Sequence, residues 1–138
     1  MNEDIEIMAK TMYGEARGEY PRKNVGIKSL IAIGNVIMNR SKKLEKQITE
    51  VCLHPKQFSC WNRQDPNRAV IDSITEKDII FNLCFETASK IICEEIGDIT
   101  NEADHYYSRF ARKKPYWAEN QTPVSEVGNH IFFKLYKT

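Results

Sequence analysis

Apolar residues recur at helical spacing in three stretches of the chain. Within residues 4–16 they fall at positions i, i+3, i+4 and i+7, which predicts a helix with one buried face. The same spacing over residues 26–40 predicts a second helix. A third helix is expected to begin near Thr75, where Asp78 three residues later makes a start like a capping box, and to end at Gly97. Its apolar content makes it the expected central helix of the core.

Patterns in the remaining segments are shorter. Residues 41–73 are irregular, and only residues 49–53 suggest a turn of helix. Residues 103–107 and 131–136 look like two short strands, which we expect to pair. No repeat, low-complexity tract or long linker divides the chain. We therefore predict one domain over residues 1–138, of the α+β class but mainly α, with a minor β-sheet.

Glu15 lies at the margin of the apolar stripe of the first predicted helix. At about 100° per residue it projects roughly 20° beyond Met8, so we expect a half-buried carboxylate. Gly18 and Pro21 end the helix after it, which places Glu15 in the last turn, where the helix dipole disfavours a negative charge. Both effects are expected to raise its pKa toward that of a general acid near neutral pH.

Two further features place polar groups among apolar residues. Asn35 falls inside the stripe of the second helix, and a buried amide without partners would cost about 1–3 kcal/mol. We expect it either to bond neighbouring backbone or to line a polar cleft. In the segment that follows, Phe58 and Trp61 either belong to the core or stack on a sugar ring, whose hydroxyls would be bonded by Gln57, Ser59 and Asn62.

Charge adds little to this picture. The chain has 20 lysines and arginines against 19 acidic residues, a net charge of +1, which gives weak attraction to nucleic acid or to anionic membranes. We expect no nucleic-acid partner. A local basic run is either a solvated loop, which we favour, or a contact for an anionic polymer or single-stranded nucleic acid; it consists of Arg109, Arg112, Lys113 and Lys114.

The cysteines, histidines and N-terminus exclude other classes. The four cysteines form no C-x-x-C pair, so we expect reduced thiols. His54, His105 and His130 form neither an H-E-x-x-H motif nor a close pair, which argues against a metal-dependent peptidase, and we expect no metal or cofactor. The acidic first residues do not resemble a signal peptide, and no apolar run is long enough to be an integral membrane segment. We expect a protein that is cytoplasmic as synthesised and reaches any external substrate after release or export.

One run of residues carries a family resemblance. Met12-Tyr13-Gly14-Glu15-Ala16-Arg17-Gly18-Glu19 resembles the signature of the SleB-like cell-wall hydrolases, the family of spore-cortex-lytic enzymes and related phage endolysins. Similar blocks follow in family order: residues 31–40, Lys56-Gln57-Phe58-Ser59-Cys60-Trp61, Asp98-x-Thr100, Ala103-x-His105-Tyr106-Tyr107, Pro115-x-Trp117-Ala118 and Gly128-x-His130-x-Phe132. The resemblance covers nearly the whole chain. It departs at Asn101-Glu102, where family members commonly carry two glycines.

The resemblance implies a lysozyme-like fold and cleavage of peptidoglycan glycan strands between N-acetylmuramic acid and N-acetylglucosamine. The matching catalytic residue is Glu15, with Glu19 as a less favoured acid because Gly18 is expected to place it in solvent. Members of this type are expected to act as lytic transglycosylases, in which one glutamate protonates the leaving oxygen and then deprotonates the muramic 6-hydroxyl. The substrate-binding residues that we infer are Glu19, Asn35, Gln57, Phe58, Ser59, Trp61, His105, Tyr106, Tyr107, Trp117 and His130. We expect a monomer.

Two alternatives stay open at this point. A hydrolytic muramidase would need a second carboxylate, for which Asp65, Glu102 and Asp104 are candidates by composition alone. A catalytically inactive wall-binding module would use the same aromatic residues. The chain carries no peptidoglycan-binding repeat, which fits an isolated catalytic domain such as a prophage endolysin.

Overall fold

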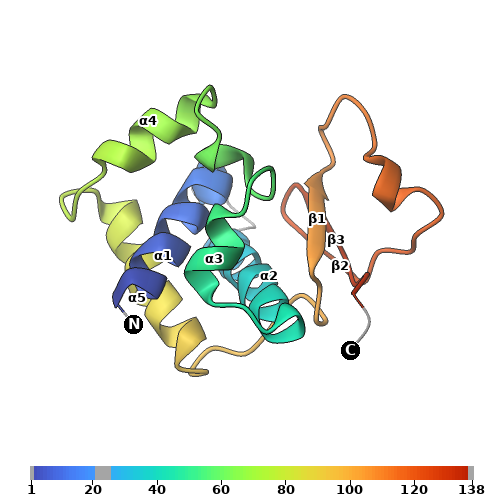
Figure 1. The fold of residues 1–138 in the computed structure, drawn as a ribbon, viewed down its shortest axis with the longest axis horizontal. Helices are drawn as coiled ribbons and strands as arrows, with labels where there is room; N and C mark the ends of the chain where they lie inside the picture. The colour runs from blue at the N-terminus through green and yellow to red at the C-terminus, as the bar shows by residue number, and fades with distance from the viewer. Residues whose placement is uncertain (1, 21–25, 137–138) are drawn as a thin grey trace.

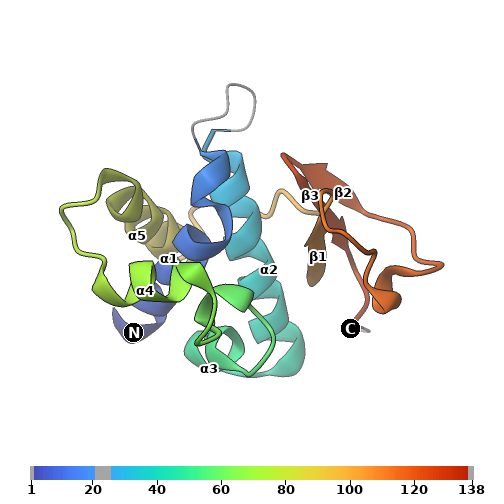
Figure 2. The same ribbon diagram turned by 90° about the horizontal axis from the view of Figure 1, so that it is seen from above.

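The computed structural model describes residues 2–20 and 26–136. In these residues a group of five α-helices lies beside a small antiparallel sheet (Figure 1). Figure 2 shows α2 (Lys28–Leu44) between α1 (Asn2–Ala16) and the sheet. No helix in the described part of the chain is long and apolar enough to cross a membrane.

The long helices follow the apolar pattern. The predictions for α1 and α3 (Ile48–Leu53) are confirmed, and α2 runs one turn beyond the expected end, to a left-handed Glu45. The third predicted helix is shorter than expected. Asp78 rather than Thr75 caps α5 (Ile79–Ile92), because its carboxylate accepts a hydrogen bond from the Phe81 backbone nitrogen. Pro21 lies outside the described residues.

Helix α4 (Pro66–Ser73) falls in the segment expected to be irregular. Asp65 caps it by accepting a hydrogen bond from the Asn67 backbone nitrogen at 2.8 Å, and Pro66 occupies the first turn. An acidic cap followed by proline is a common helix start, since proline lacks the N–H that would stay unbonded there. The sequence therefore held a signal for α4 that the apolar spacing did not show.

The helical core forms where α1 packs against α5 and α2. Met8, Met12, Leu30 and Ile33 are fully buried in it. Gly34 on α2 permits the close approach of α2 to α5, because a Cβ there would lie 2.6 Å from Cδ1 of Ile91 on α5.

The sheet has the strand order β1-β3-β2, with all pairs antiparallel. Strands β1 (His105–Ser108) and β3 (His130–Phe133) pair as predicted, and the three-residue strand β2 (Ser125–Val127) was not predicted. Tyr106 lies opposite Phe132, and both contact the α2 side, where Phe132 packs on α2. Alternate residues of β1 therefore face away from the helices.

The connection from α5 to β1 contains Asn101 and Glu102, at the positions where the SleB-like family commonly carries two glycines. Asn101 and Glu102 both have positive φ angles, 59° and 65°. Left-handed backbone favours glycine, and asparagine tolerates it better than most residues. The turn therefore keeps the backbone shape that two glycines would adopt, at the cost of some strain at Glu102.

Candidate active site

Glu15 lies at the end of α1, where the helices meet the sheet. Its side chain is half-buried, as predicted. One carboxylate oxygen, Oε1, accepts a hydrogen bond from the Tyr106 hydroxyl on β1. The other, Oε2, accepts bonds from the Cys60 backbone nitrogen at 3.1 Å and the Ser59 hydroxyl at 3.4 Å. Groups from both sides of the junction thus orient the same carboxylate.

The short 3-10 helix Ser59–Trp61 is fixed directly against α1. A Cβ on Gly14 would lie 2.6 Å from Cβ and 2.8 Å from Sγ of Cys60, so only glycine permits this approach. One turn earlier on α1, the Thr11 hydroxyl accepts a hydrogen bond from Trp61 Nε1 at 2.9 Å. These contacts hold the Cys60 N–H in position to donate to Glu15.

Tyr106 donates to Glu15 as a neutral phenol. Burial raises the pKa of Tyr106 well above its ordinary value, and the neighbouring Glu15 carboxylate raises it further. The ring is enclosed by Phe132 at 5.7 Å between centroids and by His130, edge-on, at 5.1 Å. Tyr106 is therefore a fixed hydrogen-bond donor at neutral pH, and it does not compete with Glu15 as a base.

The expectation that Glu19 lies in solvent is wrong. Its side chain is buried, because the chain continues after α1 in a 3-10 turn over Arg17–Glu19 that turns it toward the sheet. Its Oε1 accepts a hydrogen bond from the Asn129 backbone nitrogen at 2.6 Å, and its Oε2 pairs with His130 Nδ1 at 2.7 Å. Glu19 and His130 thus form a second group behind Tyr106, which tethers α1 to the start of β3.

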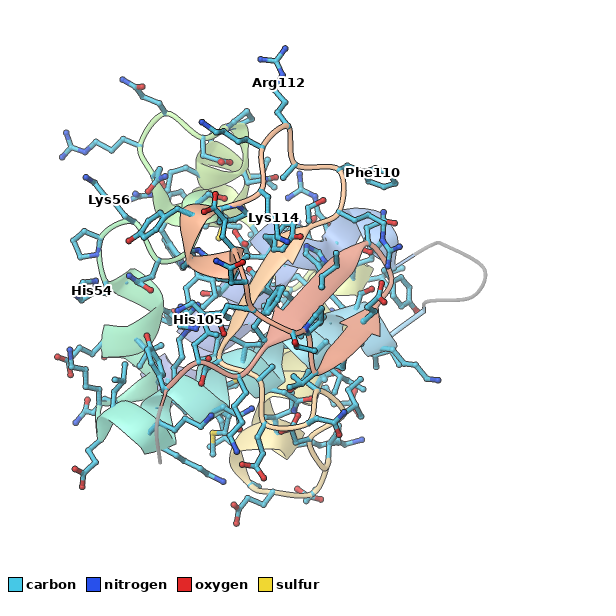
Figure 3. All side chains as sticks on the ribbon, turned by 90° about the vertical axis from the view of Figure 1, so that its right-hand side faces the viewer. His54, Lys56, His105, Phe110, Arg112 and Lys114 are labelled. Atoms are coloured by element: carbon cyan, nitrogen blue, oxygen red, sulfur yellow. The ribbon has the colours of Figure 1, made fainter. Side chains whose placement is uncertain are left out.

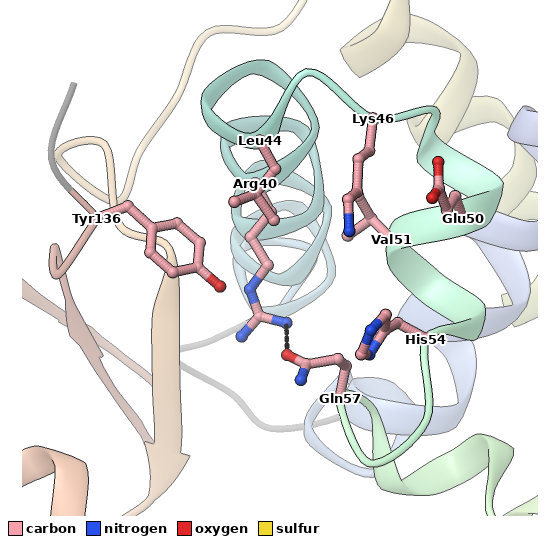
Figure 4. A pocket seen from close by; sticks show the side chains of 8 residues that line it. All are labelled: Arg40, Leu44, Lys46, Glu50, Val51, His54, Gln57 and Tyr136. Carbon is pink, nitrogen blue, oxygen red and sulfur yellow. Dashed lines mark hydrogen bonds between the residues drawn. The ribbon is translucent and has the colours of Figure 1, made fainter.

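Three of the inferred substrate-binding residues make their contacts within the protein. Phe58 is 1% exposed, so its interpretation as a stacking platform for sugar is wrong and the core alternative is confirmed. Asn35 is buried and accepts a hydrogen bond from the Ile99 backbone nitrogen at 3.0 Å, which confirms the backbone alternative. Gln57 accepts a bond from Arg40 at 3.2 Å in a pocket beside α3 (Figure 4).

His105 lies on the face of the sheet that points away from the helices (Figure 3). Tyr107, two residues further along β1, shares this face, and the Trp117 ring packs against both side chains. Trp117 lies 5.1 Å from His105 and 6.0 Å from Tyr107 between ring centroids, and Phe133 stacks on Tyr107 at 5.8 Å. The structure therefore does not group these three residues with Glu15. A role for them in binding substrate stays a prediction.

The basic run lies in the exposed connection after β1. Figure 3 shows Phe110 and Arg112 projecting away from the sheet. Arg109 forms an ion pair with Glu126, so one of the four positive charges of the basic run already has a partner within the protein. The solvated-loop interpretation agrees with this placement.

The three candidates for a second carboxylate have structural partners. Asp104 is fully buried and pairs with Lys43 at 2.9 Å and with His105 at 2.8 Å. Burial alone would raise the pKa of Asp104, but these bonds and two backbone N–H donors hold it well below its usual range. Asp65 caps α4, and Glu102 pairs with Lys134 at the surface.

The cysteines and histidines do not assemble a metal centre in the described residues, where no three metal-ligating side chains converge. All four cysteines are free. Burial raises the pKa of Cys52 and Cys84 to about 12, so both are inert thiols. Burial also raises the pKa of Cys60, next to Glu15, so its thiol stays neutral.

The sequence predicted the half-burial of Glu15, but it did not predict most of the groups that position its carboxylate. Thr11 is polar within the buried face of α1, which was a visible signal for a specific partner. The Cys60 backbone nitrogen and the Asn129 backbone nitrogen gave no signal, because any residue supplies a backbone N–H.

Comparisons with known proteins agree with this architecture. The crystal structure of the catalytic domain of the Bacillus cereus SleB protein has a TM-score of 0.70 and 20% identity, over 97% of this chain and 91% of that one. The catalytic domain of the germination-specific lytic transglycosylase SleB from Bacillus anthracis has a TM-score of 0.67 and 20% identity, over 97% and 95%. These likenesses show the fold, which is lysozyme-like and mainly helical, with a minor sheet, as expected.

The sequence comparisons point the same way. The spore cortex-lytic enzyme of Bacillus subtilis is 29% identical over 135 residues, which are 95% of this chain and 37% of the relative. That of Bacillus cereus is 30% identical over 136 residues, 95% of this chain and 44% of the relative. The chain thus spans less than half the length of these curated relatives. The family model described as Cell Wall Hydrolase matches residues 26–133. The chain belongs to this cell wall hydrolase family.

Proposed function

We propose that the protein cleaves peptidoglycan glycan strands between N-acetylmuramic acid and N-acetylglucosamine, as a lytic transglycosylase with Glu15 as its only acid and base. The observation that carries the proposal is the Glu15 carboxylate, half-buried at the junction of helices and sheet and oriented on both oxygens. Such an arrangement suits a group that must give up and recover a proton at one fixed point.

The proposed reaction uses Glu15 twice. Protonated Glu15 first donates its proton to the glycosidic oxygen as an oxocarbenium-like centre develops on the muramic acid. The resulting carboxylate then takes the proton of the muramic 6-hydroxyl, whose oxygen attacks the same carbon and closes the 1,6-anhydro ring. Tyr106 and the Cys60 N–H stabilise the carboxylate between the two transfers, because both remain donors throughout.

An internal nucleophile fits the way the other carboxylates are used. Asp104 and Glu19 are buried in ion pairs with neighbouring side chains, and Asp65 caps a helix. A carboxylate nucleophile or base would need to face the substrate with its oxygens available. The 6-hydroxyl of the substrate meets that need without a second acidic residue.

The setting of the reaction is also part of the proposal. The relatives named spore cortex-lytic enzymes support a cell-wall substrate, since they align along 95% of this chain. We place its action at the wall after release or export, as for a prophage endolysin, acting as a monomer on the glycan strands.

Release of soluble fragments from purified peptidoglycan tests the role of Glu15. We expect the wild type to release fragments and the rate of release by Glu15→Gln to be at least about 10³-fold lower, because glutamine cannot transfer the proton. Glu76→Gln, an exposed glutamate before α5, is the matched control and should behave as the wild type. Equal activity of Glu15→Gln and the wild type would refute the assignment. Binding to peptidoglycan without any release by the wild type would instead indicate a wall-binding module.

Glu19 needs its own variant, because it is the other buried glutamate near the junction. Glu19→Gln keeps the hydrogen bond that it accepts from Asn129 and removes only the charge beside His130. We expect a partial loss of activity because the loss of the ion pair destabilises the fold, and a lower melting temperature should accompany it. Complete loss of activity in a fully folded Glu19→Gln protein, with Glu15→Gln still active, would transfer the acid role to Glu19.

A further inference from the structure

A cavity of about 210 Å³ opens between the last turns of α2, helix α3 and the segment after β3 (Figure 4). Arg40, Lys46, His54, Gln57 and Tyr136 line it, together with Glu50 and two apolar side chains. Its volume is below the range of about 300–1,000 Å³ that is typical of whole small-molecule sites. The cavity therefore suits one small group of a larger ligand and is too small for a disaccharide.

Arg40 makes this cavity unusual. The residue is 5% exposed, and its Nε donates to the Asp104 carbonyl at 2.6 Å while Nη1 donates to Gln57 Oε1 at 3.2 Å. Its guanidinium also lies over the Phe58 ring, 4.9 Å from the centroid. All of these partners are neutral. Among the described residues, no carboxylate lies within ion-pairing distance of Arg40.

A buried cation without a counter-ion is costly, and an anionic ligand removes that cost. The other charged groups around the cavity favour the same ligand. The Lys46 ammonium faces the Arg40 guanidinium across the cavity, next to the His54 ring, and Glu50 is the single acidic side chain in the lining (Figure 4). The Tyr136 hydroxyl points toward Arg40 from the opposite wall and adds a neutral donor. A carboxylate fits this set, since arginine binds both of its oxygens.

The cavity is close to Glu15 along the chain. Gln57 at its rim precedes Ser59 by two residues, and the Ser59 hydroxyl bonds Glu15. Two residues of extended chain span at most about 7 Å, so the rim and the acid are on the order of 10 Å apart. A peptide covers about 3.3–3.6 Å per residue, so two or three residues of it bridge this gap.

We propose that this cavity binds a carboxylate of the stem peptide carried by N-acetylmuramic acid, and so selects strands with substituted muramic acids. The inference rests on the proposed function, because it places the glycan at Glu15. The stem peptide is attached to the same N-acetylmuramic acid whose glycosidic bond is cleaved. It bears free carboxylates on the second and third residues from the sugar. Arg40 and Lys46 supply the positive charge that recognises them, and the His54 ring adds a hydrogen-bonding group.

Cleavage rates on two substrates test the selection. Peptidoglycan with intact stems is compared with the same strands after an amidase has removed the stems. We expect kcat/KM of the wild type to fall about tenfold on the bare strands. Lys46→Gln and His54→Gln, both exposed and outside the core, should each lower activity about threefold on intact strands and leave the bare strands unaffected. Lys77→Gln before α5 is the matched control.

Equal rates on the two substrates would overturn the inference, as would a Lys46→Gln effect of the same size on both. If the wild type cleaves neither substrate, the proposed function fails, and a binding measurement decides the cavity separately. Wild-type protein is titrated with a soluble stem tripeptide that has free carboxylates, with its amidated counterpart and with inorganic phosphate, followed by NMR. Shifts at Lys46, His54 and Gln57 with the free acid alone support the carboxylate site. Shifts with neither peptide, with both equally, or mainly with phosphate overturn it.

Discussion

Replacing Gly14 with alanine puts a methyl group where Cys60 already lies. The new Cβ would be 2.6 Å from Cβ and 2.8 Å from Sγ of Cys60, well inside van der Waals contact. Cβ of Cys60 is bonded directly to its backbone, so rotation of the side chain can move Sγ but cannot relieve the contact with Cβ. The 3-10 helix that carries the Cys60 N–H must therefore move away from α1, and with it the donor to Glu15.

The size of the effect follows from two opposing contributions. Overpacking of this kind costs about 1–3 kcal/mol, whereas alanine in place of glycine within a helix contributes about 0.5–1 kcal/mol of stability. We expect Gly14→Ala to lose about 1–2 kcal/mol, a fall in melting temperature of roughly 4 °C for each kcal/mol in a chain of this length. A shift of the site by about 1 Å should lower peptidoglycan cleavage about a hundredfold.

Gly18→Ala is the matched control, because no atom lies within 4 Å of the Cβ that it adds. Thermal unfolding by circular dichroism compares the two variants with the wild type. Adding Cys60→Gly to Gly14→Ala removes both clashing atoms, so the double variant should be more stable than the sum of the single changes predicts. Gly14→Ala as stable and as active as Gly18→Ala would refute the close contact between α1 and Cys60.

Three further changes test other parts of the account. Tyr106→Phe keeps the ring and removes the hydroxyl that donates to Glu15. We therefore expect fragment release to fall about ten- to a hundredfold, with little change in melting temperature. Tyr116→Phe, at the surface, is the control and should change neither fragment release nor melting temperature. Trp61→Phe removes the hydrogen bond that the Thr11 hydroxyl accepts, while that hydroxyl still donates to the Ile7 carbonyl at 2.7 Å, so urea unfolding should show a loss of about 0.5–1.5 kcal/mol. Asp104→Asn should cost about 3–5 kcal/mol at pH 7. Folding lowers the pKa of Asp104, so its contribution is fully present above the unfolded value of about 4 and decreases progressively as the pH falls from there through the lower folded value. A destabilisation by Asp104→Asn that is as large at pH 3 as at pH 7 would contradict this.

Regular spacing made most of the fold predictable. Apolar residues recur over enough turns in α1, α2 and α5 to define one buried face each, and the pairing of β1 with β3 followed from two short apolar runs. Helix α4 has eight residues and β2 has three, too few for periodicity to stand out. Only the Asp65-Pro66 start marked α4 locally.

The half-burial of Glu15 was predictable because the angle between helical positions is fixed. Its donors were not, since Tyr106 and Cys60 lie 91 and 45 residues away along the chain. The burial of Glu19 depends on Asn129, 110 residues away, and Gly18 gave the opposite impression of a chain leaving the structure. Long-range partners of this kind have no local pattern.

Strand alternation would have corrected one grouping. His105, Tyr106 and Tyr107 are consecutive in β1, so the middle side chain must face the opposite way from its neighbours. Only Tyr106 contacts Glu15, while the other two join Trp117 on the outer face. Treating the three as one substrate-binding block overlooked this period of two.

Mass spectrometry of the muropeptides released from purified peptidoglycan tests the central claim most directly. Wild-type protein and Glu15→Gln are compared in parallel, and the chemical form of the new muramic ends is identified. Transglycosylation with Glu15 as acid and base predicts 1,6-anhydromuramic ends from the wild type and none from the variant. Reducing muramic ends would contradict the internal nucleophile and indicate hydrolysis with a second carboxylate.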